Sequence, residues 1–164
     1  MKRSLIIGGA VVAVGIGWAL FRPDLLLVNK TVNESFPGAA VAQSASGNTG
    51  PRALSTGQFR GLAHKTDGTA TIYEGADGKR TLRLENFATS NGPALHVYLV
   101  AAKDAPDNAT VKKAGFIDLG ALKGNKGDQN YTLPADVDLE TYRTVSIWCA
   151  RFGVNFAAAP LAPE

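Results

Sequence analysis

Three side chains in this sequence are of types that can carry redox or metal chemistry: the single cysteine, Cys149, and the only two histidines, His64 and His96. A thiolate can exchange electrons or bind a metal, and an imidazole can bind copper or haem iron. A blue-copper site normally adds a histidine and a methionine soon after the cysteine, but no histidine follows Cys149 and the only methionine is Met1. No metal site is therefore predicted. The candidate catalytic residue is Cys149. The candidate cofactor ligands are Cys149, His96 and His64.

Cys149 ends a segment, Thr144–Cys149, in which the side-chain pattern is that of a β-strand. Alternation along a strand places Cys149 on the same face as the core-type residue Ile147 and opposite Trp148. One interpretation is a buried thiol that acts as a small apolar core residue. The other is a redox thiol or cofactor ligand. If the strand continues, Arg151 shares that face, and a cation beside a thiol favours the reactive thiolate.

The two histidines carry weaker signals. His96 shares a strand face with Tyr98, opposite the apolar Val97, so we expect it to be exposed or bonded to a loop. His64 lies in a loop or at the start of a strand. The sequence contains no Gly-x-Ser-x-Gly, His-Glu-x-x-His or Cys-x-x-Cys motif. Whether the protein is an enzyme is therefore uncertain, and a redox or binding module is favoured over a stand-alone enzyme.

The elements that must position these residues are short strands. Seven β-branched, aromatic or alternating segments are separated by turn signals, at residues 69–73, 81–85, 95–100, 115–119, 129–133, 144–149 and 154–156. The first two flank an Asp-Gly turn and predict a hairpin. The pattern predicts an all-β domain, an antiparallel β-sandwich of about seven to nine short strands. We expect a helical turn at 138–142, a solvated acidic turn at 104–108, and no other helix in the domain.

An uncharged apolar run from Leu5 to Phe21 follows the basic residues Lys2 and Arg3. As a helix, its roughly 17 residues would span about 26 Å, close to the about 30 Å of a bilayer core. Basic residues before the run favour a cytoplasmic N-terminus, so the sequence predicts a single-pass cell-membrane protein with its C-terminal domain outside, in the periplasm or extracellular space. A cleaved signal peptide, whose apolar region is usually about 7–15 residues, and a buried soluble helix are the alternatives.

The chain divides by composition into three parts. Residues 1–32 are the anchor and a membrane-proximal segment, residues 33–56 are rich in small and polar side chains and predict a flexible linker, and residues 57–161 form the β-domain. From Arg52 onward there are 13 of the 17 basic residues and 12 of the 14 acidic residues. The excess of positive charge therefore lies mainly before the domain. The domain has no basic stripe with interleaved aromatics, which excludes a nucleic-acid binder.

Five strings in the domain resemble a known family. They are HKTDGTATIY (64–73), LRLENF (82–87), SNGPALHVYL (90–99), LGALKGNKGDQNY (119–131) and SIWCARFGVNF (146–156). In this order they closely resemble the DM-thirteen domain family, often labelled an electron-transfer domain, over about residues 57–161. The resemblance implies an extracytoplasmic β-sandwich, found in animals beside DOMON domains, which bind haem or sugar.

The resemblance also implies a redox role for the cysteine of a Trp-Cys motif, here Trp148-Cys149, as a thiol or as the attachment point of a group such as haem. His64 and His96 would be accessories. Two hypotheses follow from the sequence. The first is a membrane-anchored extracytoplasmic electron-transfer or thiol redox module centred on Cys149, working with a redox protein or an envelope component. The second is a non-catalytic binding or interaction sandwich in which Cys149 is a buried core residue.

Overall fold

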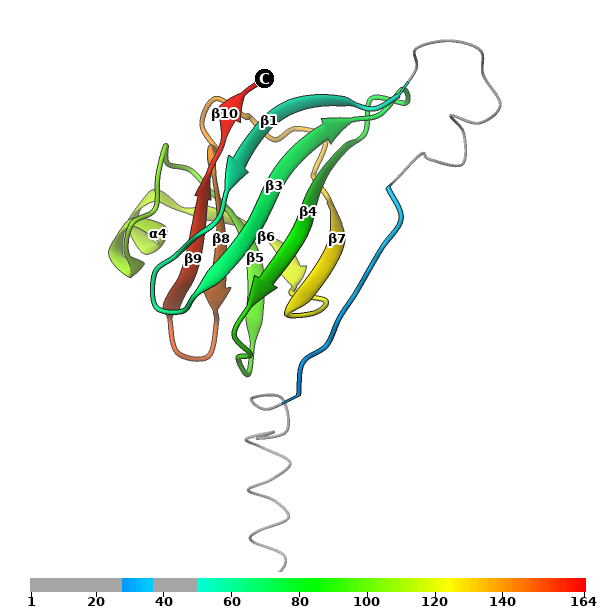
Figure 1. The fold of residues 1–164 in the computed structure, drawn as a ribbon. Coiled ribbons are helices and arrows are strands. Elements are labelled where there is room, and N and C mark those ends of the chain that lie inside the picture. The colour runs from blue at the N-terminus through cyan, green and yellow to red at the C-terminus, as the bar shows by residue number, and fades with distance from the viewer. Residues whose placement is uncertain (1–27, 37–49) are drawn as a thin grey trace, which may run out of the picture.

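The computed structural model describes residues 28–36 and 50–164. It consists of two antiparallel five-stranded sheets packed face to face (Figure 1). The first sheet has the order β10 (Ala162–Pro163), β1 (Arg52–Gln58), β3 (Thr66–Glu74), β4 (Arg80–Thr89), β7 (Lys126–Thr132). The second has the order β2 (Arg60–Gly61), β9 (Val154–Pro160), β8 (Thr144–Cys149), β5 (Leu95–Val100), β6 (Phe116–Ala121). The predicted all-β sandwich is confirmed.

The core lies between the two sheets. It is built from the residues of each sheet that face inward, which alternate along the strands with residues that face outward. Ile72 and Leu84 from the first sheet meet Val97 and Ile147 from the second, and all four side chains are fully buried. Fully burying one such side chain contributes about 1.5–3 kcal/mol of transfer free energy. This core therefore fixes which face of β5 and β8 points inward.

Each of the seven predicted strands overlaps an observed strand, and β3 and β4 form the predicted hairpin. The observed total is ten strands rather than seven to nine, because β1 and the two-residue strands β2 and β10 were not predicted. β1 is difficult to find because its sequence, RALSTGQ, is dominated by small and polar residues. β1 is a strand because its backbone pairs with β3, and not because it has an apolar pattern of its own.

The prediction that the domain contains no further helix is wrong. Helix α4 (Asn108–Ala114) begins at the last residue of the segment 104–108, for which a solvated acidic turn is predicted. Asp107 caps its N-terminus by accepting a hydrogen bond from the Thr110 amide at 2.7 Å, and Gly115, at φ 82°, ends it. Only Val111 is buried, so the seven residues show no apolar stripe. The predicted turn at 138–142 is present, with the Tyr142 amide donating to the Asp138 carbonyl.

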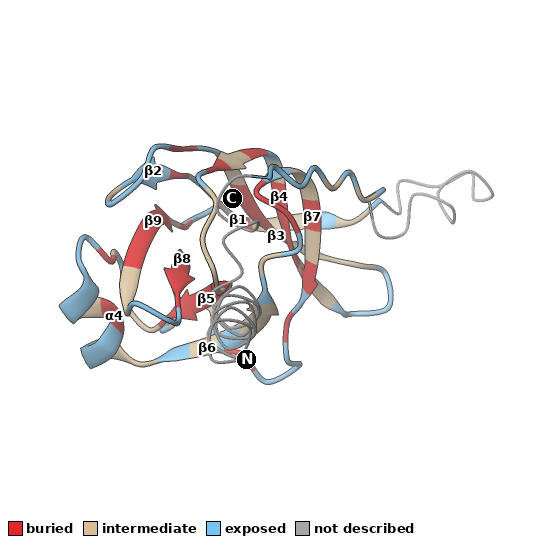
Figure 2. Ribbon diagram, turned by 90° about the horizontal axis from the view of Figure 1, so that it is seen from below, coloured by how far each residue is buried: buried red, intermediate tan, exposed pale blue. Residues whose placement is uncertain are grey.

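Helix α4 and the loop before it cover the outer face of the second sheet. Tyr98, Val111, Trp148 and Ala158 form a second, smaller apolar cluster there, outside the main core. As a result every residue of β8 is buried, as the red ribbon of β8 shows in Figure 2. The strand that carries Cys149 is thus enclosed on both faces.

Residues 29–36, which we call the strap, run along the outer edge of β7. Thr31 forms a parallel bridge with Lys126, and the amides of Val32 and Glu34 donate to the carbonyls of Lys126 and Asp128 at 2.9 Å. The predicted linker, 33–56, therefore differs from the structure at both ends, since 33–36 lie on β7 and 52–56 lie in β1. Backbone pairing with a sheet edge needs no apolar pattern, so composition did not indicate it.

The predicted membrane span, from Leu5 to Phe21, lies outside the described residues. Within residues 28–36 and 50–164, no helix combines the length and the apolar character that crossing a bilayer requires.

Candidate functional site

The Trp148-Cys149 pair lies at the end of β8, and its two side chains point to opposite faces of the second sheet. Cys149 belongs to the core between the sheets and is fully buried. Its neighbours directly across β5 and β9 are Leu95 and Val154. Trp148 belongs to the outer cluster and is 5% exposed. The predicted alternation along this strand is confirmed.

The full burial of Cys149 limits the chemistry that its thiol can perform. Thiol–disulfide exchange requires a thiolate to reach a partner's sulfur atom directly. In this conformation the apolar side chains of the core separate the thiol from solvent. Exchange would need local opening of the sandwich, whereas transfer of a single electron would not require contact with the sulfur.

The expectation that Arg151 shares the inner face with Cys149 is wrong. β8 ends at Cys149, and the chain turns immediately, with the Gly153 amide donating to the Cys149 carbonyl at 2.8 Å. Gly153 has φ 64°, which a glycine adopts without strain. Arg151 therefore lies in the exposed turn between β8 and β9 rather than beside the thiol.

Three aromatic rings form a stacked column on the outer face of the second sheet. Trp148 and Tyr98 stack with ring centroids 6.1 Å apart and planes inclined by 22°. Tyr98 and Phe116 stack at 4.0 Å and are nearly parallel, at 5°. Tyr98 is 6% exposed, and Phe116 is 41% exposed. The column of Trp148, Tyr98 and Phe116 thus leads from the residue next to Cys149 to the surface.

Charged and hydrogen-bonding side chains lie beside this aromatic column. The Lys112 ammonium lies 5.8 Å from the Trp148 ring centroid, and His96 Nδ1 lies 2.9 Å from Asp118 Oδ2. Asp118 is directly opposite Tyr98 across β5 and β6. Burial, and to a smaller extent the charge of Asp118, raise the pKa of the Tyr98 phenol above its usual value. The phenol therefore carries its proton at neutral pH.

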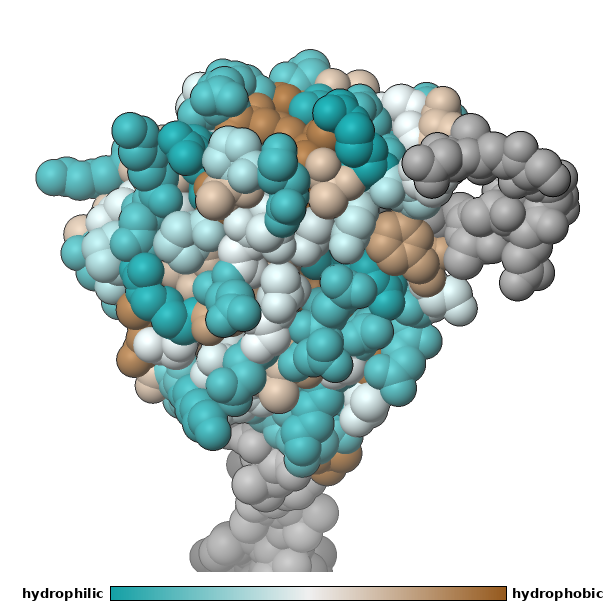
Figure 3. Space-filling model, turned by 45° about the horizontal axis from the view of Figure 1, so that its top comes forward, coloured by the Kyte–Doolittle hydropathy of each residue, from teal (hydrophilic) through white to brown (hydrophobic). Residues whose placement is uncertain are grey.

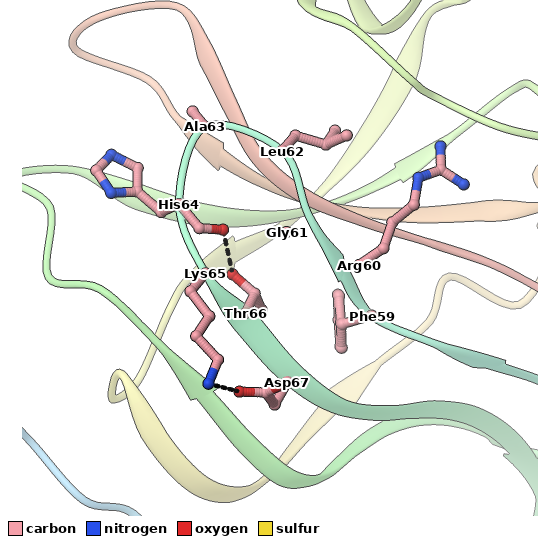
Figure 4. Close-up of a pocket in the computed structure, with 9 residues that line it drawn as sticks. All are labelled: Phe59, Arg60, Gly61, Leu62, Ala63, His64, Lys65, Thr66 and Asp67. Carbon is pink, nitrogen blue, oxygen red and sulfur yellow. Dashed lines mark hydrogen bonds and ion pairs between the residues drawn. The ribbon is translucent and has the colours of Figure 1, made fainter.

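The structure does not bring Cys149, His64 and His96 together. His96 lies on the outer face of the second sheet, paired with Asp118, while Cys149 points inward. His64 is exposed in the loop between β2 and β3, where its ring packs on Phe156 at 4.0 Å. Figure 4 shows this loop, which lines a shallow depression, with the His64 imidazole pointing away from the other labelled side chains.

The surroundings of Cys149 do not fit the haem that the family resemblance suggested. A haem attached to this thiol would have to occupy the packed core, where the thiol is enclosed by apolar side chains. Neither histidine points into that core. In the described part of the chain, no group of three or more His, Cys, Asp or Glu residues is arranged to hold a metal ion.

The sequence reasoning missed the aromatic column. Tyr98 was placed on the outward face with His96, and Trp148 on the face opposite Cys149, but neither was joined to the other. The available signal was that both are large aromatics on the outward face of a strand. Their contact depends on β5 and β8 being neighbours, although 43 residues separate the two strands in the chain.

Comparison with known proteins agrees with the resemblance found in the sequence. The model of the family described as Electron transfer DM13 matches residues 58–161. This span includes Cys149 and all three residues of the aromatic column. No curated protein and no solved structure matches the chain.

Proposed function

The chain belongs to the Electron transfer DM13 family, and from this premise we propose that it is a one-electron transfer module centred on Trp148 and Cys149. The apolar run from Leu5 to Phe21 anchors it in the cell membrane and holds the sandwich outside the cytoplasm. Its partner is a redox protein or another component of the envelope. The family supports the electron-transfer role, and the proposal assigns that role to particular residues.

The observation that carries the proposal is the aromatic column. Electron tunnelling weakens steeply with distance, so a series of rings whose centroids are 4.0 and 6.1 Å apart provides a better route than a single gap of the same total length. Tyr98 and Trp148 are the oxidisable members, and Phe116 is the exposed ring against which a partner can dock. A route of this kind connects surface and interior without exposing the thiol.

The electron and proton can be followed through one oxidation. A one-electron oxidant at Phe116 removes an electron from Tyr98, and the phenol proton leaves with it because an oxidised phenol is a strong acid. We assign Asp118, the cross-strand neighbour of Tyr98, as the acceptor of that proton. The Cys149 thiol then supplies an electron through Trp148, and the proton returns from Asp118, which restores Tyr98. The oxidised thiol releases its own proton to water when the sandwich opens locally. A reductant at the same surface would return the system to its starting state.

Photochemical oxidation of the full-length chain tests this route. Photogenerated tris(bipyridine)ruthenium(III) serves as the oxidant in a Trp18→Phe background, and electron paramagnetic resonance identifies the radical. We expect a tyrosyl signal that Tyr98→Phe removes and that the control Tyr142→Phe, whose ring packs against the main core between the sheets, leaves in place. Equal signals from both variants would contradict the assignment of Tyr98.

A second candidate function rests on the burial of Cys149. A fully buried thiol between Leu95 and Val154 is also what a core-filling cysteine looks like. In that case the sandwich is a non-catalytic binding or interaction module, and its loops contact a partner. The two functions differ in one measurable respect, because only the first makes the lifetime of a Tyr98 radical depend on the thiol.

A further inference from the structure

The strap is held on β7 by side chains as well as by backbone pairing. At its start, the Lys30 amide donates to Asn125 Oδ1 at 2.7 Å. Further along, the Glu34 carboxylate accepts from Lys123 Nζ at 2.8 Å and from the Asn130 amide at 2.7 Å. These contacts fix the strap to β7 and to the turn before it.

Two glycines make room for the strap. A Cβ atom on Gly124 would lie 2.4 Å from the Lys30 carbonyl oxygen, and one on Gly127 would lie 2.1 Å from that of Val32. Real Cβ atoms essentially never approach backbone oxygen so closely. The turn before β7 and the start of β7 are therefore shaped to receive the strap backbone.

Docking of the strap fixes where the chain from the apolar run reaches the domain. Asn29 Oδ1 accepts from Asn125 Nδ2 at 2.8 Å and lies 3.4 Å from Asn91 Nδ2, so the strap begins beside the β4–β5 and β6–β7 turns. The β8–β9 turn is at the same end, because the Ala150 amide donates to the Ala94 carbonyl. We call this end of the sandwich, formed by residues 28–31, 61–67, 90–94, 122–126 and 150–153, the turn end (lower end in Figure 1).

The docked strap also shortens the connection between the apolar run and the domain. An extended chain advances at most about 3.3–3.6 Å per residue, so the steps from Phe21 to Val28 span at most about 25 Å. If the domain were held only at Arg52, the same limit would be about 110 Å. β4 alone is about 33 Å long at about 3.3 Å per residue. A connection of at most about 25 Å is shorter than this, so it keeps the end of the sandwich where the strap begins nearer to the apolar run than the opposite end.

The side chains of the turn end suit a membrane surface. Phe152, at the tip of the β8–β9 turn, is 67% exposed, and Val28 is 65% exposed. The turn end also carries the exposed basic residues Lys30, Lys65, Lys126 and Arg151. Among the described residues of the turn end, Asp67 is the only acidic one.

The opposite end of the sandwich has the reverse character. Its turns at 75–79 and 134–142 carry Asp77, Asp136, Asp138 and Glu140 against Lys79, and Arg80 and Arg143 directly follow them. Figure 3, in which the top of Figure 1 comes forward, shows largely hydrophilic side chains there around a small apolar patch. The molecule therefore has one basic end with exposed apolar side chains, and an opposite end with more acidic than basic residues.

From these observations we propose that the turn end lies against the anionic headgroups of the bilayer that holds the apolar run, with Phe152 inserted at the headgroup boundary. This inference rests on the membrane anchoring in the proposed function. Basic side chains are attracted to anionic lipid, and an adjacent apolar side chain gains by burial at the boundary. The strap then acts as the device that orients the domain, and the aromatic column faces sideways along the membrane.

Tryptophan quenching in vesicles tests the orientation. The full chain, in a Trp18→Phe background, carries either Phe152→Trp at the turn end or Ala76→Trp, also on an exposed hairpin turn, at the opposite end. Each is reconstituted in phosphatidylcholine and phosphatidylglycerol vesicles whose acyl chains carry bromine, a contact quencher. We expect Phe152→Trp to lose most of its added emission and Ala76→Trp to lose little. Equal loss from the two variants, with both floating with the vesicles, overturns the orientation alone.

Two further outcomes separate the steps of the inference. A chain that does not float with the vesicles overturns the anchoring and the orientation together. Gly124→Ala, which places a Cβ against the strap, is expected to remove the quenching of Phe152→Trp while thermal unfolding of the domain persists. Gly50→Ala, which meets no atom within 4 Å, is the matched control and keeps the quenching. Quenching that survives Gly124→Ala contradicts the role of the strap.

Discussion

Replacing Cys149 by serine tests how apolar the environment of the thiol is. The side chain is fully buried, and its cross-strand neighbours Leu95 and Val154 offer no polar atom. A hydroxyl buried without a partner costs about 1–3 kcal/mol of stability. For a domain of this size the loss corresponds to a fall in melting temperature of about 4–12 °C, at about 4 °C per kcal/mol.

The matched variant is Cys149→Ala, which removes the sulfur without adding a hydroxyl. Denaturant unfolding of the full chain, followed by circular dichroism, gives the free energies of both variants. We expect Cys149→Ser to be less stable than Cys149→Ala, because only serine leaves a polar atom unpaired. If serine is equally stable or more stable than alanine, the hydroxyl finds a partner, and the description of an apolar site is refuted.

Three further predictions concern the thiol, the strap and the helix. Alkylation of Cys149 by iodoacetamide should proceed only as fast as the domain opens, and a rate equal to that of a free thiol would contradict its burial. Burial alone would raise the pKa of Glu34, but its bonds to Lys123 and Asn130 outweigh this and lower it. Strap docking should therefore weaken as pH falls through that lowered pKa, and hydrogen exchange at Val32 should show this in the wild type but not in Glu34→Gln. Asp107→Ala should cost about 0.5–2 kcal/mol by removing the cap of α4, as measured by denaturant unfolding.

The strands were predictable because period-two alternation against a buried face leaves a strong pattern. The segment Thr144–Cys149 shows this best, since its observed bounds and the inward direction of Cys149 both follow from the alternation. Elements without such a pattern were missed. Helix α4 buries only Val111, and β1 and the strap owe their order to pairing with strands distant in the chain.

The candidate site was predictable only in part for a related reason. Alternation gives the face on which a side chain lies, but not which strand lies next to it. Tyr98, Phe116 and Trp148 become neighbours only through the order β8, β5, β6, which a single sequence does not reveal. The misplacement of Arg151 has a local cause, because β8 ends at Cys149 and the chain turns through Gly153.

The central claim, that Cys149 and the aromatic column act as one redox unit, is tested most directly by the lifetime of the Tyr98 radical. After a flash of light in the presence of the ruthenium oxidant, transient absorption follows the radical in the wild type and in Cys149→Ser, each in the Trp18→Phe background. If the thiol supplies the electron that restores Tyr98, the radical persists longer in Cys149→Ser than in the wild type. Equal lifetimes in two folded proteins would contradict the claim and leave Cys149 as a residue of the core.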